Sequence, residues 1–396
     1  MDPETQNPFR ARLAALREQD RLRSVSGWPG LPGKHVERDG RRCLNLSSND
    51  YLGLSGHPRV RRAAAEAALA LGTGAGGSRL LGGGLPLHRE LEAAVAAMRP
   101  LGKALLFNTG FMANLGALQA LAPALGTVFS DKANHASMAE ALRSMPGGFR
   151  RFRHRDLGHL ESLLAANAGD KPGLVCSETL FSMDGDAADV PGLIRLQEKY
   201  GFWLYLDEAH STGCLPSLSA PALDAGFASG RILIMGTFGK AYGGFGAYVA
   251  GPGDAIDWLA NSARSFIFST ALPPAAAAAA LEALKVAEEE SWRRELLAEN
   301  AAYARDLFRR RGFDIGSSES HIVPVIAGSE RTALRLSGAL YHAGYHAPAV
   351  RPPTVPDGSS RLRINLTCEI GRPEIDALAD AVSAALDESA NEAGDG

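Results

Sequence analysis

The sequence predicts an α/β protein, with a mostly parallel sheet covered by helices on both faces in a large domain and a smaller α+β domain after it. Between residues 104 and 235, short segments typical of strands alternate with segments typical of helices, which is the order of repeated βαβ units. The strand segments are apolar throughout, as strands buried on both faces are. This alternation ends after Gly251, so a second kind of domain is expected in the C-terminal third of the chain.

Composition places the chain among ordinary globular proteins. It has 396 residues, of which 45% are hydrophobic and 21% charged, enough for a large core and a second domain. The net charge of -3 gives no basic field, which disfavours nucleic acid or an anionic membrane as a partner. The polar N-terminus lacks the apolar core of a signal peptide, and the alanine run 275–280 is too short to span a bilayer. We therefore expect a cytoplasmic protein that acts on small molecules.

The N-terminal segment, residues 1–50, is expected to hold one amphipathic helix and one strand. Residues 8–24 carry their apolar side chains on or near one helical face, so this helix should pack on a larger body. Residues 41–46 follow as a short strand.

The large domain is placed at residues 51–285. Its expected strands are 104–107, 127–130, 150–153, 173–178, 202–206, 232–235 and 247–250. Two expected helices have only a predicted start, at residues 58 and 109. The other expected helices span residues 87–98, 135–145, 157–166, 191–200 and 255–264. In parallel sheets ligands bind at the carboxyl ends of the strands, so the polar residues directly after each strand are candidate site residues.

Residues 286–390 are expected to form the smaller α+β domain. After a long helical region that ends near Arg311, its expected strands are 322–326, 347–351 and 361–366, and its expected helices are 331–342 and 372–386. Residues 391–396 are expected to be a frayed tail.

Lys240 lies on a glycine-rich turn, GTFGKAYGGFG, between two expected buried strands. A lysine presented on a rigid turn is a place where a carbonyl cofactor can form a Schiff base. A surface lysine on a tight turn has the same local sequence. Lys240 alone therefore does not decide between these two interpretations.

Four further polar residues follow strands of the same sheet. Asp207 closes one strand, where a carboxylate can pair with a protonated ring nitrogen or simply cap a helix. His210 lies three residues later, where an imidazole can bond a phenolate oxygen. His135 can stack on a flat aromatic ring or end a helix, and Ser182 lies in a turn after its strand.

A helix is expected to begin directly after strand 104–107, with Thr109 and Gly110 at its start. Free N–H groups and the positive dipole end make such a start a natural phosphate site, although an ordinary helix cap is the alternative. One interpretation explains this helix start together with Lys240 and the four strand-end residues. It is a pyridoxal phosphate site.

Other motifs fail on spacing or context. The glycines of GTGAGG (residues 72–77) satisfy G-x-G-x-x-G but follow a helical segment where a dinucleotide site requires a strand. The chain has no GxSxG motif, and GTFGKA lacks the spacing of a P-loop. His154 and His159 lack the spacing of a helical zinc pair, and residues 184–189 do not match an EF-hand loop. No metal site is expected, because the four cysteines are scattered along the sequence and contain no CxxC pair. They are Cys43, Cys176, Cys214 and Cys368.

Taken together, the ordered motifs resemble the α-oxoamine synthase family of fold-type I pyridoxal phosphate enzymes, over essentially residues 8–388. The motifs that carry the resemblance are SSNDYLGLS (47–55), GTGAGGSR (72–79), HASM (135–138), FSMDGD (181–186), DEAHSTG (207–213), GTFGKA (236–241), FSTALPP (268–274) and RPPTVPDGSSRLRINLT (351–367). The resemblance implies the PLP-dependent transferase fold of type I, with a mostly parallel sheet of the seven-stranded type in the large domain.

The resemblance also implies a role for each matching residue. Lys240 would bind the cofactor as a Schiff base and move the proton at the substrate Cα, and Asp207 would keep the pyridine nitrogen protonated. His135 would stack on the ring, and Ser182 and His210 would bond its oxygen. The phosphate would be held by Thr237, by the backbone of Gly110 and Phe111, and by Ser269 and Thr270 lent by the second subunit of a homodimer. The substrates would be bound by Arg23, Asn49, Thr354 and Arg363.

The implied reaction is the decarboxylative condensation of an amino acid with an acyl thioester. RPPTVP followed by RLR is most similar to the family members that condense L-alanine with a pimeloyl thioester, carried by coenzyme A or an acyl carrier protein. Members that use glycine or serine, or another acyl thioester, are the alternative, and bulky Tyr242 and Phe245 after the lysine leave the acyl preference open. Because the lysine, the aspartate and the stacking histidine are all present, a catalytically inactive scaffold of this fold is disfavoured.

Overall fold

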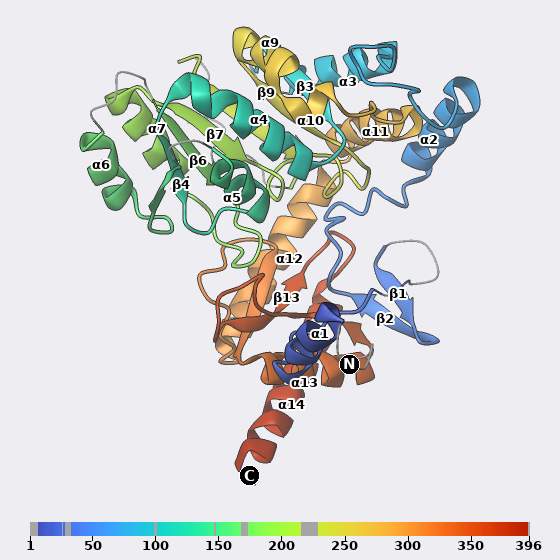
Figure 1. The fold of residues 1–396 in the computed structure, drawn as a ribbon. Helices are drawn as coiled ribbons and strands as arrows, with labels where there is room; N and C mark the ends of the chain where they lie inside the picture. The colour runs from blue at the N-terminus through green and yellow to red at the C-terminus, as the bar shows by residue number, and fades with distance from the viewer. Residues whose placement is uncertain are drawn as a thin grey trace. The chain divides into compact units, whose positions relative to one another are not determined.

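A computed structural model of the chain describes residues 7–25, 27, 33–98, 101–145, 148–167, 173–214 and 229–394 (Figure 1). The chain divides into two compact units, here called the small unit and the large unit. The small unit contains Met1–Ser48, Met183–Gly185 and Glu299–Gly396, and the large unit contains Asn49–Ser182 and Asp186–Ala298. This division differs from the expected limits at residues 50, 285 and 390, since the N-terminal segment groups with the C-terminal part of the chain.

The large unit is built on a seven-stranded sheet, as expected for this fold class. The strand order is β3 (Lys103–Phe107), β9 (Ala247–Gly251), β8 (Ile232–Thr237), β7 (Trp203–Asp207), β6 (Leu174–Glu178), β4 (Val128–Asp131) and β5 (Arg150–Phe152). The five strands from β8 to β5 run parallel to one another, and β9 is antiparallel to both β8 and β3. The predicted mostly parallel sheet is therefore confirmed.

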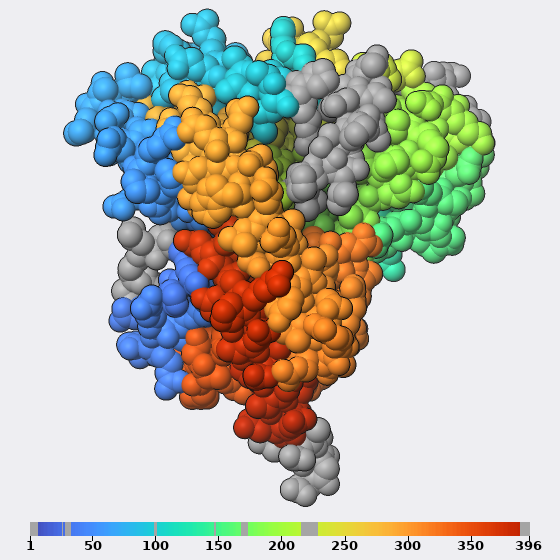
Figure 2. Space-filling view, turned by 180° about the vertical axis from the view of Figure 1, so that it is seen from behind, coloured from blue at the N-terminus to red at the C-terminus, as the bar shows by residue number. Residues whose placement is uncertain are grey.

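Helices alternate with these strands and cover the sheet (Figure 1). They are α2 (Pro58–Leu71), α3 (Pro86–Ala97), α4 (Gly110–Leu125), α5 (Ala136–Arg143), α6 (Leu157–Ala165), α7 (Val190–Tyr200), α9 (Gly253–Ser262), α10 (Arg264–Ile267) and α11 (Pro274–Glu289). The central helix is α4, whose alanines and leucines are buried on most of its circumference against the sheet and against α5, α9 and α10. In Figure 2 the orange surface of α11 lies beside the blue and cyan surfaces of α2 and α3, which it contacts.

The core beneath α4 is continuous and apolar. Leu105, Phe107, Leu233, Met235 and Val249 of the sheet share it with the helices, and all five are buried. Burial of such side chains contributes about 1.5–3 kcal/mol each. The strands that carry the polar residues at their ends are thus held in a fixed register by their own apolar residues.

The small unit joins the two ends of the chain. Its first sheet pairs β2 (Arg41–Asn45) with β1 (His35–Arg38) in antiparallel fashion and with β11 (Tyr345–His346) in parallel fashion. Its second sheet is antiparallel, in the order β10 (Ile322–Gly328), β13 (Ser360–Asn365) and β12 (Ala349–Val350). Its helices, including the part of α12 that belongs to it, are α1 (Pro8–Glu18), α12 (Trp292–Arg310), α13 (Glu330–His342) and α14 (Arg372–Gly394).

Both ends of the chain differ from the expectation. α1 ends at Glu18 rather than near residue 24, because Asp20 adopts the left-handed conformation (φ 54°). None of its residues is buried against the part of the chain that the structure describes, and Phe9 is 68% exposed. α14 continues to Gly394 where fraying was expected from residue 391, and residues 395–396 lie outside the described residues.

Among the described helices, none combines the length and the apolar character that crossing a bilayer requires.

Candidate active site

A cavity of about 190 Å³ lies at the carboxyl ends of β6, β7 and β8, beside the first turn of α4. Its residues come from distant parts of the sequence and meet here because neighbouring parallel strands end at the same edge of the sheet. Most of the cofactor-binding residues predicted from the sequence line it, namely Gly110, Phe111, His135, Asp207, His210, Thr237 and Lys240.

Lys240 reaches the cavity from the turn between β8 and β9. Its Nζ lies 2.7 Å from Nε2 of His210, whose Nδ1 lies 2.8 Å from the hydroxyl of Tyr51. That hydroxyl donates its proton to Oδ1 of Asn49 at 3.0 Å, so Nδ1 of His210 is the donor and its Nε2 accepts from the lysine. Two residues of the SSNDYLGLS motif therefore orient the histidine next to the lysine.

The turn that carries Lys240 depends on glycine at Gly243. This residue has a φ of +63°, and a Cβ placed on it would lie 2.1 Å from the backbone nitrogen of Ser55. Of the two bulky residues noted in the sequence, Tyr242 is buried and Phe245 is half exposed. Tyr242 therefore packs beneath the turn rather than projecting into solvent.

Asp207 ends β7 and is buried. Its Oδ2 accepts a hydrogen bond from Nδ2 of Asn114 at 2.8 Å, and its Oδ1 accepts one from the backbone N–H of Ala209 at 2.9 Å. These two hydrogen bonds hold both oxygens of the Asp207 carboxyl group in one position at the wall of the cavity.

His135 immediately precedes α5, and its ring lines the cavity where solvent reaches it. Its Nδ1 lies 2.8 Å from the hydroxyl of Ser137. Desolvation by the surrounding side chains lowers the pKa of His135, and the positive charge of Lys240 lowers it further. The negative charge of Asp207 acts in the opposite direction and raises the pKa. The ring is consequently neutral near pH 7, which suits stacking on a flat ring.

Glu178 also lines the cavity, and the sequence analysis did not select it. It ends β6 directly opposite Asp207, and it is almost completely buried. Burial raises the pKa of Glu178 well above that of an ordinary carboxyl, and the neighbouring charge of Asp207 adds to the effect. Its Oε1 is buried and has no hydrogen-bond partner in the part of the chain that the structure describes. Its position at the end of a predicted strand was the signal that could have identified it.

The cavity borders the N-terminus of α4. Thr109 caps this helix, with its hydroxyl accepting from the backbone N–H of Met112 at 3.2 Å. The first backbone N–H groups, at Gly110 and Phe111, belong to the positive end of the helix dipole. Thr237 lies across the cavity and donates its hydroxyl proton to the carbonyl of Gly246 at 2.9 Å.

Three predicted cofactor residues of the large unit do not line this cavity. Ser182 is buried beside it and supplies a backbone N–H to the Glu178 carboxyl. Ser269 and Thr270 line a separate, small pocket instead. There the carbonyl of Thr270 accepts from the side-chain amide of Asn108 at 2.8 Å.

Three of the four predicted substrate residues belong to the small unit, and the fourth, Asn49, belongs to the large unit. Nη2 of Arg23 donates to the carbonyl of Arg351 at 3.2 Å, and the backbone N–H of Thr354 donates to the same carbonyl at 3.1 Å. Arg363 lies on β13 opposite Pro324 of β10. Arg23 and Thr354 are thus brought together although they are distant in sequence.

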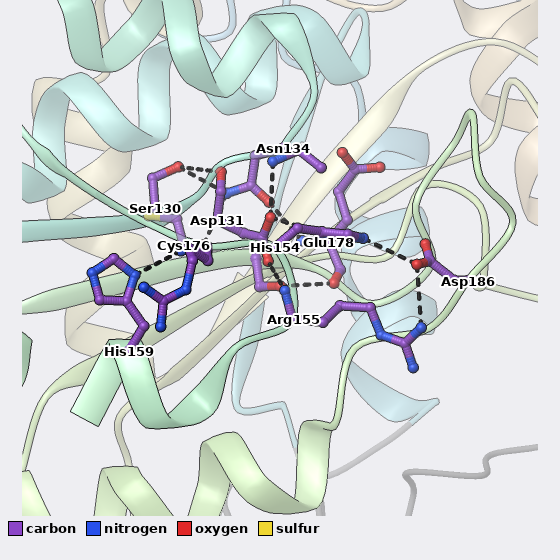
Figure 3. A network of polar contacts seen from close by, with 12 residues as sticks. Ser130, Asp131, Asn134, His154, Arg155, His159, Cys176, Glu178 and Asp186 are labelled. Atoms are coloured by element: carbon purple, nitrogen blue, oxygen red, sulfur yellow. Dashed lines mark hydrogen bonds and ion pairs between the residues drawn. The ribbon is translucent and has the colours of Figure 1, made fainter. Parts of the chain in front are cut away.

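A second polar cluster supports the segment that carries Ser182 (Figure 3). His154 bridges two buried carboxylates, with Nδ1 at 2.9 Å from Asp131 and Nε2 at 3.0 Å from Asp186, and Arg155 contacts Asp186 at 3.2 Å. Desolvation alone would lower the pKa of His154, but the hydrogen bonds to the two aspartates outweigh it and raise the pKa to about 10. Among the described residues, no group of three or more histidine, cysteine, aspartate or glutamate side chains is placed to hold a metal ion.

Comparisons with known proteins agree with this geometry. A family model described as aminotransferase class I and II matches residues 41–382. A Bacillus cereus (strain ATCC 10987 / NRS 248) protein named "Putative 8-amino-7-oxononanoate synthase" is 42% identical over 363 residues, which is 91% of this chain and 92% of that protein. Among solved structures, serine palmitoyltransferase from S. paucimobilis with bound PLP–myriocin aldimine superposes with a TM-score of 0.88 at 27% identity, covering 97% of this chain and 98% of that one. The 8-amino-7-oxononanoate synthase from Francisella tularensis superposes with a TM-score of 0.74 at 25% identity, covering 88% and 98%.

Proposed function

The chain belongs to the aminotransferase class I and II family, and on this premise we propose that it condenses L-alanine with a pimeloyl thioester. The products are 8-amino-7-oxononanoate, CO2 and the free thiol, a step of biotin biosynthesis. The main support for the proposal is that Lys240, Asp207 and His135 line the same cavity. The substrate choice is supported by the name of the 42% identical relative and by the RPPTVP motif.

Pyridoxal phosphate is the cofactor of this enzyme, and the cavity fits it. The amine of Lys240 suits its aldehyde, and the carboxylate of Asp207 suits its ring nitrogen. The imidazole of His135 suits its ring face, and the N-terminus of α4 suits its phosphate. The buried Oε1 of Glu178, which has no hydrogen-bond partner among the described residues, is a further polar atom for a bound molecule to satisfy. When bound, the cofactor supplies an electron sink for the charge that develops at the amino-acid Cα.

The chain's own residues bind the cofactor and move the proton. The amine of Lys240 would hold the aldehyde and, once released from it, would remove the proton at the amino-acid Cα and later return one. His210 keeps that amine in place through its Nε2, because Tyr51 holds the proton of the imidazole on Nδ1. Asp207 would accept a hydrogen bond from the ring nitrogen, which favours the charged ring that makes the electron sink effective.

The predicted substrate residues are carried into the proposal. Asn49 and Arg363 are proposed for the carboxylate of the amino acid, and Arg23 and Thr354 for the far end of the acyl chain. Arginine suits both tasks because its planar fork pairs with a carboxylate through two parallel hydrogen bonds.

We extend the proposal to a homodimer in which Ser269 and Thr270 complete the phosphate site of the other subunit. Within their own chain they line a separate pocket, and Thr270 is bridged to Ser78 of the glycine-rich loop. Two large apolar side chains of these segments are exposed, Leu81 by 89% and Phe268 by 70%. A second copy that covers them would explain their exposure. Light scattering after gel filtration tests this idea, and a monomer that binds the cofactor tightly would refute it.

The experiment that tests the function has two steps. Purified protein should be yellow with bound cofactor, and borohydride should attach the cofactor covalently to Lys240. Alanine with pimeloyl-coenzyme A or pimeloyl-carrier protein should then release CO2 and the free thiol. Failure of borohydride to label Lys240 would reject the cofactor chemistry, and labelling without turnover of these substrates would reject the substrate choice.

A second candidate is a synthase that uses serine or glycine with another acyl thioester. It is favoured by one observation, since the serine palmitoyltransferase superposes more closely on this chain than the Francisella tularensis synthase does. The same assay with serine, glycine, acetyl-coenzyme A and palmitoyl-coenzyme A discriminates the two. Faster thiol release with serine and palmitoyl-coenzyme A than with alanine and the pimeloyl donor would establish the second candidate.

A further inference from the structure

Asn114, which no sequence motif singled out, is fully buried one turn into α4 and makes three side-chain hydrogen bonds. Its Nδ2 donates to Oδ2 of Asp207 at 2.8 Å and to the hydroxyl of Ser137 at 2.9 Å. Its Oδ1 accepts from the hydroxyl of Tyr205 at 2.9 Å. One amide therefore joins α4 to the end of β7 and to the start of α5.

The orientation of this amide is determined by its partners. Turning it over would place its carbonyl oxygen against the Asp207 carboxylate, and both groups only accept hydrogen bonds. Burial raises the pKa of Tyr205 well above its usual value, and the charge of Asp207 adds to the effect, so this hydroxyl remains a donor. Asp207 consequently receives an N–H at one fixed position.

The same chain of hydrogen bonds reaches His135. Because the Ser137 hydroxyl oxygen accepts from Asn114, its own proton is available for Nδ1 of His135 at 2.8 Å. The backbone N–H of Ser137 points to the same nitrogen at 3.3 Å. Nδ1 is therefore an acceptor, and the ring proton of the neutral imidazole is on Nε2.

We propose that Asn114 is a positioning residue that orients the Asp207 carboxylate and the His135 ring together before pyridoxal phosphate binds. Asp207 and His135 contact the cofactor at different places, its ring nitrogen and its ring face. A single buried amide makes their placement interdependent. The inference rests on the proposed function, because these two groups need orienting only if a ring binds between them.

The test is an equilibrium titration of the cofactor-free protein with pyridoxal phosphate, followed by absorbance. Asn114→Ala should weaken binding about tenfold or more, since it removes a hydrogen bond to a charged carboxylate. Ser137→Ala should weaken it only about threefold, because Asp207 keeps its partner. The control is Gln119→Ala on the same helix, whose exposed amide bonds Ser144 at 2.8 Å and which should leave affinity unchanged.

A fourth variant gives a signature that general loss of packing does not produce. Asn114→Asp places a second carboxylate against Asp207, so its affinity for the cofactor should be lowest near about pH 8 and should recover toward about pH 5, where the pair shares a proton. The parent protein and Gln119→Ala should not show this recovery. If Asn114→Ala does not fold, Tyr205→Phe, which removes one hydroxyl, should still weaken binding about threefold.

The outcomes separate the two proposals. A parent protein that binds no pyridoxal phosphate overturns the proposed function. A parent protein that binds it, with Asn114→Asp and Tyr205→Phe binding equally well at every pH, overturns the role of Asn114 alone.

Discussion

Glu178 and Asp207 lie directly opposite each other on the neighbouring parallel strands β6 and β7, and both carboxyl groups are buried at the cavity. Neighbouring carboxyl groups can have different pKa values when their surroundings differ. Here the two carboxyl groups have different hydrogen-bond partners. Asp207 accepts hydrogen bonds from Asn114 and Ala209, whereas burial and the charge of Asp207 raise the pKa of Glu178. Glu178 therefore holds its proton more tightly than an ordinary carboxyl group does, and the Asp207 carboxyl is the one that hydrogen bonds fix in position.

Replacing Glu178 by glutamine should make the protein less sensitive to high pH. The folded-state pKa of Glu178 is raised, so the folded protein holds a proton that the unfolded chain loses, and stability falls as the pH rises above about 4.5 toward the folded pKa. Glu178→Gln keeps the shape and removes this dependence. Melting temperatures of the two proteins without cofactor, measured from about pH 5 to pH 9, should diverge in favour of the variant. Parallel curves would show that Glu178 is ionised throughout.

Lys240→Ala should abolish covalent attachment of the cofactor and reduce turnover by at least about a thousandfold, because no other lysine is found among the described residues that line the cavity. His210→Asn is the informative companion. It removes the acceptor of the lysine N–H but leaves the amine, so borohydride should still attach the cofactor while turnover falls. Mass spectrometry of the reduced peptides measures both results. A labelled peptide in Lys240→Ala would assign the Schiff base to another lysine.

His154→Gln should destabilise the protein by about 3 kcal/mol near pH 7, because it leaves two buried carboxylates without their shared cation. The folded-state pKa of His154 is raised to about 10, so its contribution is complete below about pH 6.5 and is lost as the pH rises through about 10. Urea unfolding at a series of pH values should show this decline in the parent protein and not in the variant. His159→Gln is the control, since the ring of His159 accepts a hydrogen bond from the backbone N–H of Arg153 and is not part of the carboxylate cluster. Equal stability of the parent and His154→Gln would contradict the role of the cluster.

Gly243→Ala should destabilise the lysine turn by on the order of 3 kcal/mol or more. Its backbone is left-handed, and the new methyl group would meet the backbone of Ser55. Gly244→Ala is a matched control in the neighbouring residue, where the nearest atom to a Cβ, the carbonyl oxygen of Phe238, lies at 3.4 Å. Thermal unfolding and cofactor absorbance should distinguish the two variants. Similar melting temperatures would show that the turn can rearrange.

The strands of the large unit could be predicted from the sequence because each is a local apolar run. The run in β6 lies between the helices α6 and α7, and its parallel pairing with β7 follows from the βαβ order. The small unit could not be predicted as well. Tyr345 and His346 form a strand of two residues that pairs with Leu44 and Asn45, and no local pattern marks so short and distant a pairing.

The candidate site shows the same limit. Lys240 and Asp207 stand out in the sequence because charged residues after apolar strands are unusual. Asn114 and Ser137 do not, since a polar residue within a helix is ordinary until the tertiary structure gives it partners. Glu178 is the last residue of an apolar strand, so the rule that selects polar residues at strand ends also applies to it.

The cluster behind Ser182 has one more consequence, for the electrostatic potential at the cavity. Its two carboxylates, Asp131 and Asp186, face one imidazolium, His154, and one guanidinium, Arg155, so the formal charges cancel. A neutral group of charges produces a field that decays much faster with distance than that of a single ion. The cluster therefore holds the segment that carries Ser182 through ionic contacts and adds no net formal charge beside the cavity.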